Sequence, residues 1–132
     1  MSAHLKLAPS RLDTIDPAAA LRGVFGIFDA WGLSAEEARV LLGAPPERSF
    51  YAWKKGQVAR VPQDLLRRIG YIAGIFKALG VVYSDPSLAD GWLRRPNAAF
   101  GEQPPLARMC AGDVTDLAAV RAYLDGARAP WS

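Results

Sequence analysis

The side chains that most often carry covalent or metal chemistry are nearly missing from this sequence. Its 132 residues include one histidine, His4, and one cysteine, Cys110. A nucleophilic triad needs a histidine beside its nucleophile, and a zinc site needs several histidine or cysteine ligands. His4 stands in the N-terminal segment, and Cys110 falls on an expected apolar helix face beside Leu106 and Met109. We therefore expect no catalytic residue, no metal and no cofactor.

Composition indicates a soluble protein of the cytoplasm. Hydrophobic residues make up 51% of the chain, which is enough for a core, and charged residues make up 22%. One cysteine cannot form an internal disulfide, which favours a reducing compartment. The sequence has neither a run of about 18 apolar residues that would cross a bilayer nor the apolar stretch of a signal peptide.

Charge is distributed unevenly along the chain. Residues 17–80 carry nine Lys or Arg against five acids, a net of +4, whereas residues 81–132 carry five against six, a net of −1. A basic first part and a nearly neutral second part predict two surfaces with different partners. We expect a flexible N-terminal arm at 1–16, a first domain at 17–80 and a second at 81–132.

Apolar spacing and capping residues predict an all-α fold. Asp16-Pro17 is typical of a helix start, Ser34 and Glu37 form a capping box, and Asp85-Pro86 predicts a further start. The expected helices are 17–31, 35–42, 47–55, 62–80, 86–93, 104–110 and 113–126.

The longest of these helices has a clear apolar seam. Its members recur at spacings of three and four, and they are Leu65, Ile69, Ile72, Phe76 and Leu79. Arg67 and Arg68 fall off this seam, so both are predicted to lie in solvent. We expect Gly80 to end the helix and residues 81–83 to form a connector.

Residues 35–55 have the layout of a helix-turn-helix, with two short helices joined by Gly-Ala-Pro-Pro. If the second is a recognition helix, Phe50 and Trp53 anchor it, and its DNA-facing residues are Arg48, Ser49, Tyr51, Lys54 and Lys55. Arg60, just beyond it, would contact phosphate. The alternative is an amphipathic surface helix with a solvated basic end, since such units also serve as dimerisation scaffolds.

The stretch 91–106 is the least helical part of the chain. Pro96 pushes Arg95 away from helical geometry, and Gly101 permits a positive φ. This pattern predicts a shaped loop that holds helices at an angle, a binding surface, or both. Trp92 and Phe100 then belong to the core or to a partner, and Asn97 caps a turn or donates to a partner. Arg94 is expected to be exposed, in solvent or against an acidic partner.

The C-terminal tail combines three different chemistries. Arg128 offers a cation, Trp131 a large apolar ring, and Ser132 the terminal carboxylate. An indole this close to the chain end either folds back onto the last helix or inserts into a partner.

Taken together, these features resemble the Xre/MbcA/ParS antitoxins of bacterial toxin–antitoxin modules. The resemblance covers about residues 17–132. It depends most on Trp92-Leu93, Pro96-Asn97, Phe100-Gly101 and Pro104-Pro105-Leu106, followed by Gly112, Val120 and Leu124. The first part matches more loosely, through Leu42-Gly43, Ser49 to Trp53 and Gly56.

This resemblance implies an Xre-like helix-turn-helix domain followed by a small helical toxin-binding domain, in a protein that is not an enzyme. It implies a cognate RES-domain toxin, which consumes NAD or transfers its ADP-ribose, with its active site covered by the antitoxin. The toxin-binding residues would be Trp92, Arg94, Asn97, Phe100, Arg128, Trp131 and Ser132. Operator binding, and a homodimer within a toxin–antitoxin hetero-oligomer, also follow from the family. The alternative is a transcriptional regulator whose second half serves for dimerisation.

Overall fold

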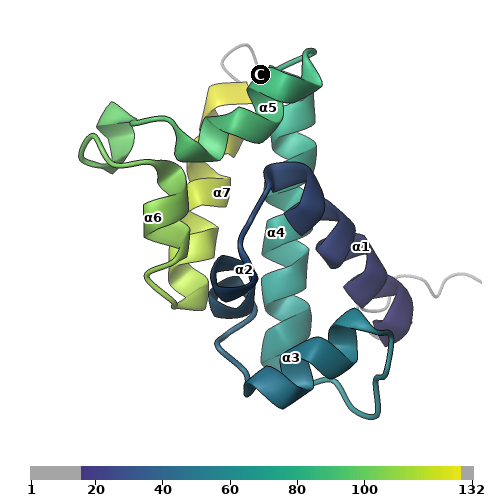
Figure 1. Cartoon of the computed structure of the whole chain (residues 1–132). Coiled ribbons are helices and arrows are strands. Elements are labelled where there is room, and N and C mark those ends of the chain that lie inside the picture. The colour runs from purple at the N-terminus through teal and green to yellow at the C-terminus, as the bar shows by residue number, and fades with distance from the viewer. Residues whose placement is uncertain (1–15, 129–132) are drawn as a thin grey trace, which may run out of the picture.

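The protein is built from helices that surround one long central helix. The computed structural model describes residues 16–128, where the only extended pairing is an isolated bridge between Asn97 and Gln103, so the all-α prediction is confirmed. The α-helices of this range are α1 (Pro17–Trp31), α2 (Ala35–Leu41), α3 (Glu47–Lys54), α4 (Gln63–Val82), α5 (Pro86–Gly91), α6 (Pro105–Met109) and α7 (Val114–Arg128) (Figure 1).

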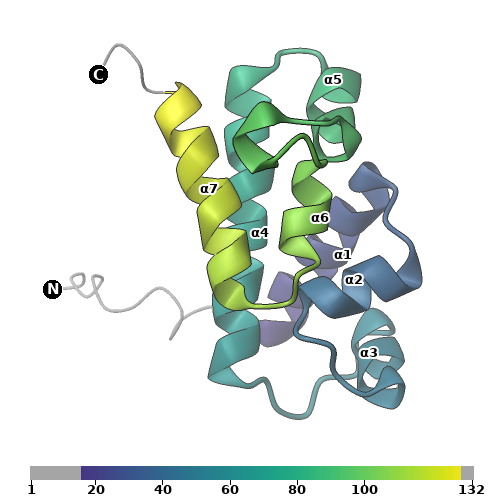
Figure 2. The same cartoon turned by 90° about the vertical axis from the view of Figure 1, so that its left-hand side faces the viewer.

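Helix α4 packs against elements from both parts of the chain. Helix α1 crosses one side of it and α7 runs beside it in the same direction (Figures 1 and 2). The approach of α7 is close, because a Cβ at Gly74 would overlap the guanidinium of Arg121. Helix α3 lies where α4 begins and α5 where it ends. None of the described helices is long and apolar enough to cross a membrane.

The caps expected from the sequence are present. Asp16 accepts a hydrogen bond from the Ala18 amide at 3.2 Å, and Asp85 accepts one from the Ser87 amide at 3.0 Å. Ser34 and Glu37 form both hydrogen bonds of the capping box. These bonds satisfy amides that a helix start leaves without partners, so they set where three helices begin.

Two predictions about α4 are wrong. The helix continues past Gly80 through Val82, and the amide of Tyr83 still donates to the Leu79 carbonyl at 2.9 Å, so of the expected connector at 81–83 only Tyr83 lies outside the helix. Ala78 and Leu79 are fully buried, and this packing outweighs the low helix propensity of glycine. Phe76, expected on the buried seam, is 39% exposed, whereas Ile75 and Ala78 are fully buried.

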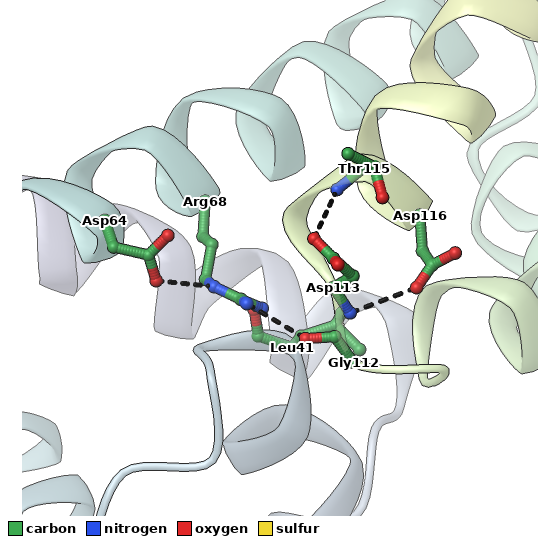
Figure 3. A network of polar contacts seen from close by, with 7 residues as sticks. All are labelled: Leu41, Asp64, Arg68, Gly112, Asp113, Thr115 and Asp116. Carbon is green, nitrogen blue, oxygen red and sulfur yellow. Dashed lines mark hydrogen bonds and ion pairs between the residues drawn. The ribbon is translucent and has the colours of Figure 1, made fainter.

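The prediction that Arg68 lies in solvent is also wrong. Arg68 is only 8% exposed, and its guanidinium lies where α4, the end of α2 and the turn before α7 meet (Figure 3). Its Nε donates to Asp64 at 2.9 Å, Nη2 to the Gly112 carbonyl at 2.9 Å and Nη1 to the Leu41 carbonyl at 3.5 Å. A buried charge is tolerated only when it is paired and hydrogen-bonded, and these contacts meet that need.

The turn that receives Arg68 is itself held by hydrogen bonds. Asp116 accepts from the Asp113 amide at 3.0 Å and from Arg108 Nε at 2.7 Å, and Asp113 accepts from the Thr115 amide at 3.2 Å. The Arg108 guanidinium lowers the pKa of Asp116 below its ordinary value, so this carboxylate remains charged at neutral pH. The start of α7 is thereby fixed relative to both α6 and α4.

We predict that Arg68→Ala lowers the free energy of unfolding by roughly 2–4 kcal/mol, because it leaves buried carbonyls without their donor. Arg67→Ala is the matched control, since Arg67 is the exposed neighbour in the same helix, and its effect should stay within about 0.5 kcal/mol. Urea denaturation of both variants measures the difference. Equal midpoints for the two would show that the Arg68 contacts contribute nothing.

Candidate partner-binding surface

The segment between α5 and α6 is an ordered loop built from two short 3-10 turns, η3 (Trp92–Arg94) and η4 (Ala98–Phe100). Asn97 caps the second, its Oδ1 accepting from the Ala99 amide at 2.8 Å. The Asn97 amide also donates to the Gln103 carbonyl at 3.2 Å, which closes the base of the loop. Gly101 has φ 66, the left-handed geometry that glycine adopts without strain. Of the two roles expected for Asn97, the structure shows the cap.

Two aromatic residues of this loop pack against a third on α7. The Trp92 ring stacks on Tyr123 at 6.1 Å between centroids, and Phe100 meets Tyr123 edge to face at 5.4 Å. Trp92 is 7% exposed and therefore core, whereas Tyr123 is 40% exposed. The sequence analysis missed Tyr123, although its position three residues after buried Val120 was a usable signal.

Arg94 joins the loop to the first part of the chain. Its Nη2 donates to Glu37 Oε1 at 2.9 Å and to the Gly32 carbonyl at 3.0 Å, and Nη1 lies 3.3 Å from Glu37 Oε2. This two-pronged bond lowers the pKa of the Glu37 carboxyl. Arg94 is exposed as expected, but in the structure its acidic partner is within the chain.

Two open hollows flank α6 beneath this loop. One, of about 430 Å³, is lined by Phe100, Gln103 and Arg108 among others, and the other, of about 360 Å³, by Glu37, Arg94 and Cys110 among others. Both include Ala107, which is exposed on α6 between them. Burial raises the pKa of the Cys110 thiol, so it remains protonated at neutral pH and is a poor nucleophile. We call the loop 92–104, Tyr123 and these hollows the loop–α6 surface.

The tail residues proposed for partner binding lie largely outside the described residues. Arg128 is the last residue of α7, and its side chain is not among those described. Trp131 and Ser132 belong to the range 129–132, which is likewise outside. What the structure does give is that α7 ends at the same end of the molecule as α4 and α5, with α4 between α7 and α5 (Figure 2).

The residues expected to contact DNA fall into two groups on and beside α3. Arg48, Ser49 and Arg60 line one open hollow of about 500 Å³ with the prolines that precede α3. Tyr51, Lys54 and Lys55 are exposed and do not line it. Phe50, 1% exposed, anchors α3 to α1 through Phe25 at 5.4 Å, as predicted, while Trp53 is half-buried. The helix thus presents a basic face at one end of the molecule.

We predict that Glu37→Gln reduces the pH dependence of stability in acid. Because the folded pKa of Glu37 is depressed, its ion pair stabilises the fold fully above the ordinary value of 4.5 and loses that effect as pH falls below it. Glutamine can still complete the capping box, so only the charge is removed. Urea midpoints at pH 7 and pH 3.5 should differ less in Glu37→Gln than in the parent, and Glu36→Gln serves as a control whose pH difference should not shrink as much. An unchanged difference would rule out the pair as a source.

Comparison with known proteins assigns the two parts of the chain. The Antitoxin Xre-like helix-turn-helix domain matches residues 10–74, and the Antitoxin Xre/MbcA/ParS C-terminal toxin-binding domain matches residues 78–129. A protein of Sinorhizobium fredii, described as uncharacterized protein y4oB, is 40% identical over 110 residues, which cover 83% of this chain and 84% of that protein. Helices α2 and α3 fall in the first match, and the loop–α6 surface, apart from Glu37, falls in the second. The chain is therefore a member of the Xre/MbcA/ParS antitoxin family, with an Xre-like helix-turn-helix domain followed by a toxin-binding domain.

Proposed function

We propose that this antitoxin neutralises a toxin of the RES class, which consumes NAD or transfers its ADP-ribose, by covering the toxin's active site with the loop–α6 surface. The observation that carries the proposal is the ordered aromatic loop above two adjoining hollows, all within the matched toxin-binding domain except Glu37. Preorganised surfaces bind well because little side-chain freedom is lost on association. Because such a toxin acts on NAD, the antitoxin and the toxin would meet in the cytoplasm.

Within this surface the three aromatic residues have different roles. Trp92 supports the loop from the core, while Tyr123 and the half-buried Phe100 offer apolar area to the toxin. Aromatic residues in such positions are frequent binding hot spots. Arg94 holds the loop on α2 through Glu37 and orients the surface, and Asn97 shapes it as a cap. The tail residues Arg128, Trp131 and Ser132 would enter the toxin's cleft, with the terminal carboxylate near the site of an NAD phosphate.

We predict that Ala107→Arg weakens toxin binding at least tenfold, because exposed Ala107 lines both hollows and a long cation there would obstruct a partner that enters them. Deletion of residues 129–132 should release NAD turnover by the toxin without lowering the melting temperature. Both are measured by titrating the antitoxin against the NAD hydrolysis or ADP-ribosylation activity of its cognate toxin.

Ala19→Arg is the matched control, because Ala19 is exposed in the first turn of α1, at the opposite end of that helix from Gly32, which Arg94 of the loop contacts. It should inhibit like the parent protein. Full inhibition by Ala107→Arg would overturn the assignment of the loop–α6 surface, and full inhibition by the shortened protein would remove the tail from the mechanism.

Operator binding is the second candidate function, and the basic exposed face of α3 favours it. Lys54 and Lys55 lie at the end of α3 with Tyr51 exposed beside them, while Arg48 and Arg60 share a hollow. Side chains of this kind contact phosphates and base edges when a recognition helix enters the major groove. This face is distant from the loop–α6 surface, so one molecule can offer both (Figure 2).

We predict that Lys54→Glu with Lys55→Glu abolishes a salt-sensitive mobility shift on the DNA upstream of the coding region and leaves toxin inhibition intact. The measurement is a mobility-shift assay at two salt concentrations, with and without toxin. Lys77→Glu is the charge-change control, because Lys77 is exposed near the end of α4, away from α3, and is not part of the loop–α6 surface. The repressor role fails if the parent protein gives no shift under any of these conditions.

A further inference from the structure

An apolar groove of about 300 Å³ runs between α1 and α4. Its walls come from Ala20, Gly23 and Ile27 of α1 and from Leu66, Gly70 and Ala73 of α4. No charged or polar side chain is among the residues that line it. A groove of this composition is poorly suited to face water and is suited to an apolar segment.

The groove is separate from both surfaces assigned above. It lies along the α1 side of α4, whereas α7 and the loop–α6 surface lie on other sides (Figures 1 and 2). All its residues belong to the match with the helix-turn-helix domain, at residues 10–74, and none to the toxin-binding match. DNA is also an unsuitable occupant, because the groove offers no cation or hydrogen-bond donor from its side chains.

Two glycines in the groove have no explanation within the described chain. Gly23 and Gly70 lie inside helices, where glycine is less favourable than alanine. A Cβ added at either position would meet nothing within 4 Å, so no described neighbour requires its absence. A chain segment lying in the groove could approach both helices closely at these two positions, because neither carries a Cβ.

The chain itself supplies a segment at the right place. Fifteen residues precede Asp16, and the last of them include Leu12 and Ile15. Asp16 is extended, with φ −70 and ψ 117, so it is not part of α1. Ala20 lies about 5 Å along the axis from Pro17, and Ala20 to Ile27 spans about 10 Å. Six extended residues reach up to roughly 20 Å, which is enough to follow the groove.

The family match adds an independent reason. The helix-turn-helix domain is matched from residue 10, which is seven residues before α1 begins at Pro17. Residues 10–15 are therefore included in the family's helix-turn-helix domain. We propose that residues 10–15 occupy the groove between α1 and α4, with Leu12 and Ile15 packed against Gly23 and Gly70, and so complete the core of the helix-turn-helix domain.

The first test uses full-length variants of the segment. Leu12→Asp with Ile15→Asp should lower the melting temperature by about 4 °C or more, because two apolar side chains leave the groove. Ser10→Asp with Thr14→Asp adds the same charge to the same segment and should leave the melting temperature within about 1 °C. Equal effects of the two pairs would overturn the proposal.

The second test places a methyl group in the groove. Gly26→Ala is the control, because Gly26 is exposed in α1, has open space around it and does not line the groove; it should raise the melting temperature by a few degrees. Gly70→Ala should fail to raise it in the parent protein, but should raise it when Leu12→Asp and Ile15→Asp are also present.

The same variants separate this proposal from the other occupants. If Gly70→Ala stabilises the parent protein as Gly26→Ala does, the groove is empty and the proposal is wrong. If light scattering shows a dimer that Gly70→Ala dissociates whatever stands at positions 12 and 15, the occupant is a second copy of the chain, which also overturns it. A Gly70→Ala effect on melting that depends on Leu12 and Ile15 supports it.

Discussion

The buried guanidinium of Arg68 is the contact on which the arrangement of the two domains depends. It comes from α4 in the helix-turn-helix domain and binds the Gly112 carbonyl just before α7 in the toxin-binding domain. The same group binds Asp64 and reaches the end of α2 at Leu41. Gly43, at the turn between α2 and α3, has φ 96, and a Cβ there would come within 3.1 Å of Arg68. The Arg68 side chain therefore packs against the turn of the helix-turn-helix and binds the turn that precedes α7 in the toxin-binding domain.

A second ion pair acts at the other edge of the toxin-binding domain. Arg94 binds Glu37 and the Gly32 carbonyl, so the loop after α5 is tied to the start of α2. An exposed pair of this kind contributes only about 0.2–1 kcal/mol, and its effect is more on orientation than on stability. Arg68 and Arg94 together with the packing of α7 on α4 join the two domains into one body. The antitoxin acts by binding a toxin and not as an enzyme, and the loop of its toxin-binding domain is held by these contacts.

Local signals predicted the helices well because they act within a few residues. Asp16, Ser34 and Asp85 cap the helices they were expected to cap, since a cap needs only its own side chain and amides two or three residues ahead. The prediction that α4 ends at Gly80 was wrong because it considered only a local effect. The low helix propensity of Gly80 is that local effect, whereas the burial of Ala78 and Leu79 that carries α4 onward comes from packing against distant helices. Phe76 was assigned to the core because a single stripe cannot show that α4 contacts helices on two sides.

Only some residues of the loop–α6 surface could be predicted from the sequence. The aromatic and proline pattern of 92–106 identified the loop, and Trp92 was open between core and contact until its stacking on Tyr123 showed that it is core. Tyr123 was missed because it is 31 residues away from Trp92 along the chain. The hollows beside Ala107 have no signature in sequence, because they form where α6 meets the loop and α2.

By itself, the sequence determined the fold class and the approximate positions of the helices. It also carried the family resemblance through Trp92-Leu93, Pro96-Asn97 and Phe100-Gly101, and the family match confirms it. Only the tertiary structure showed that Arg68 is buried and which groups bind it, while Arg67 is exposed. Arg68 stands three residues after Leu65 and four before Ile72, the spacing of the buried stripe, whereas Arg67 does not. The three acceptors that surround the buried Arg68 come from separate elements and could not be read from that spacing. A charged side chain is buried only where distant carbonyls and a carboxylate converge on it, and that convergence exists only in the folded chain.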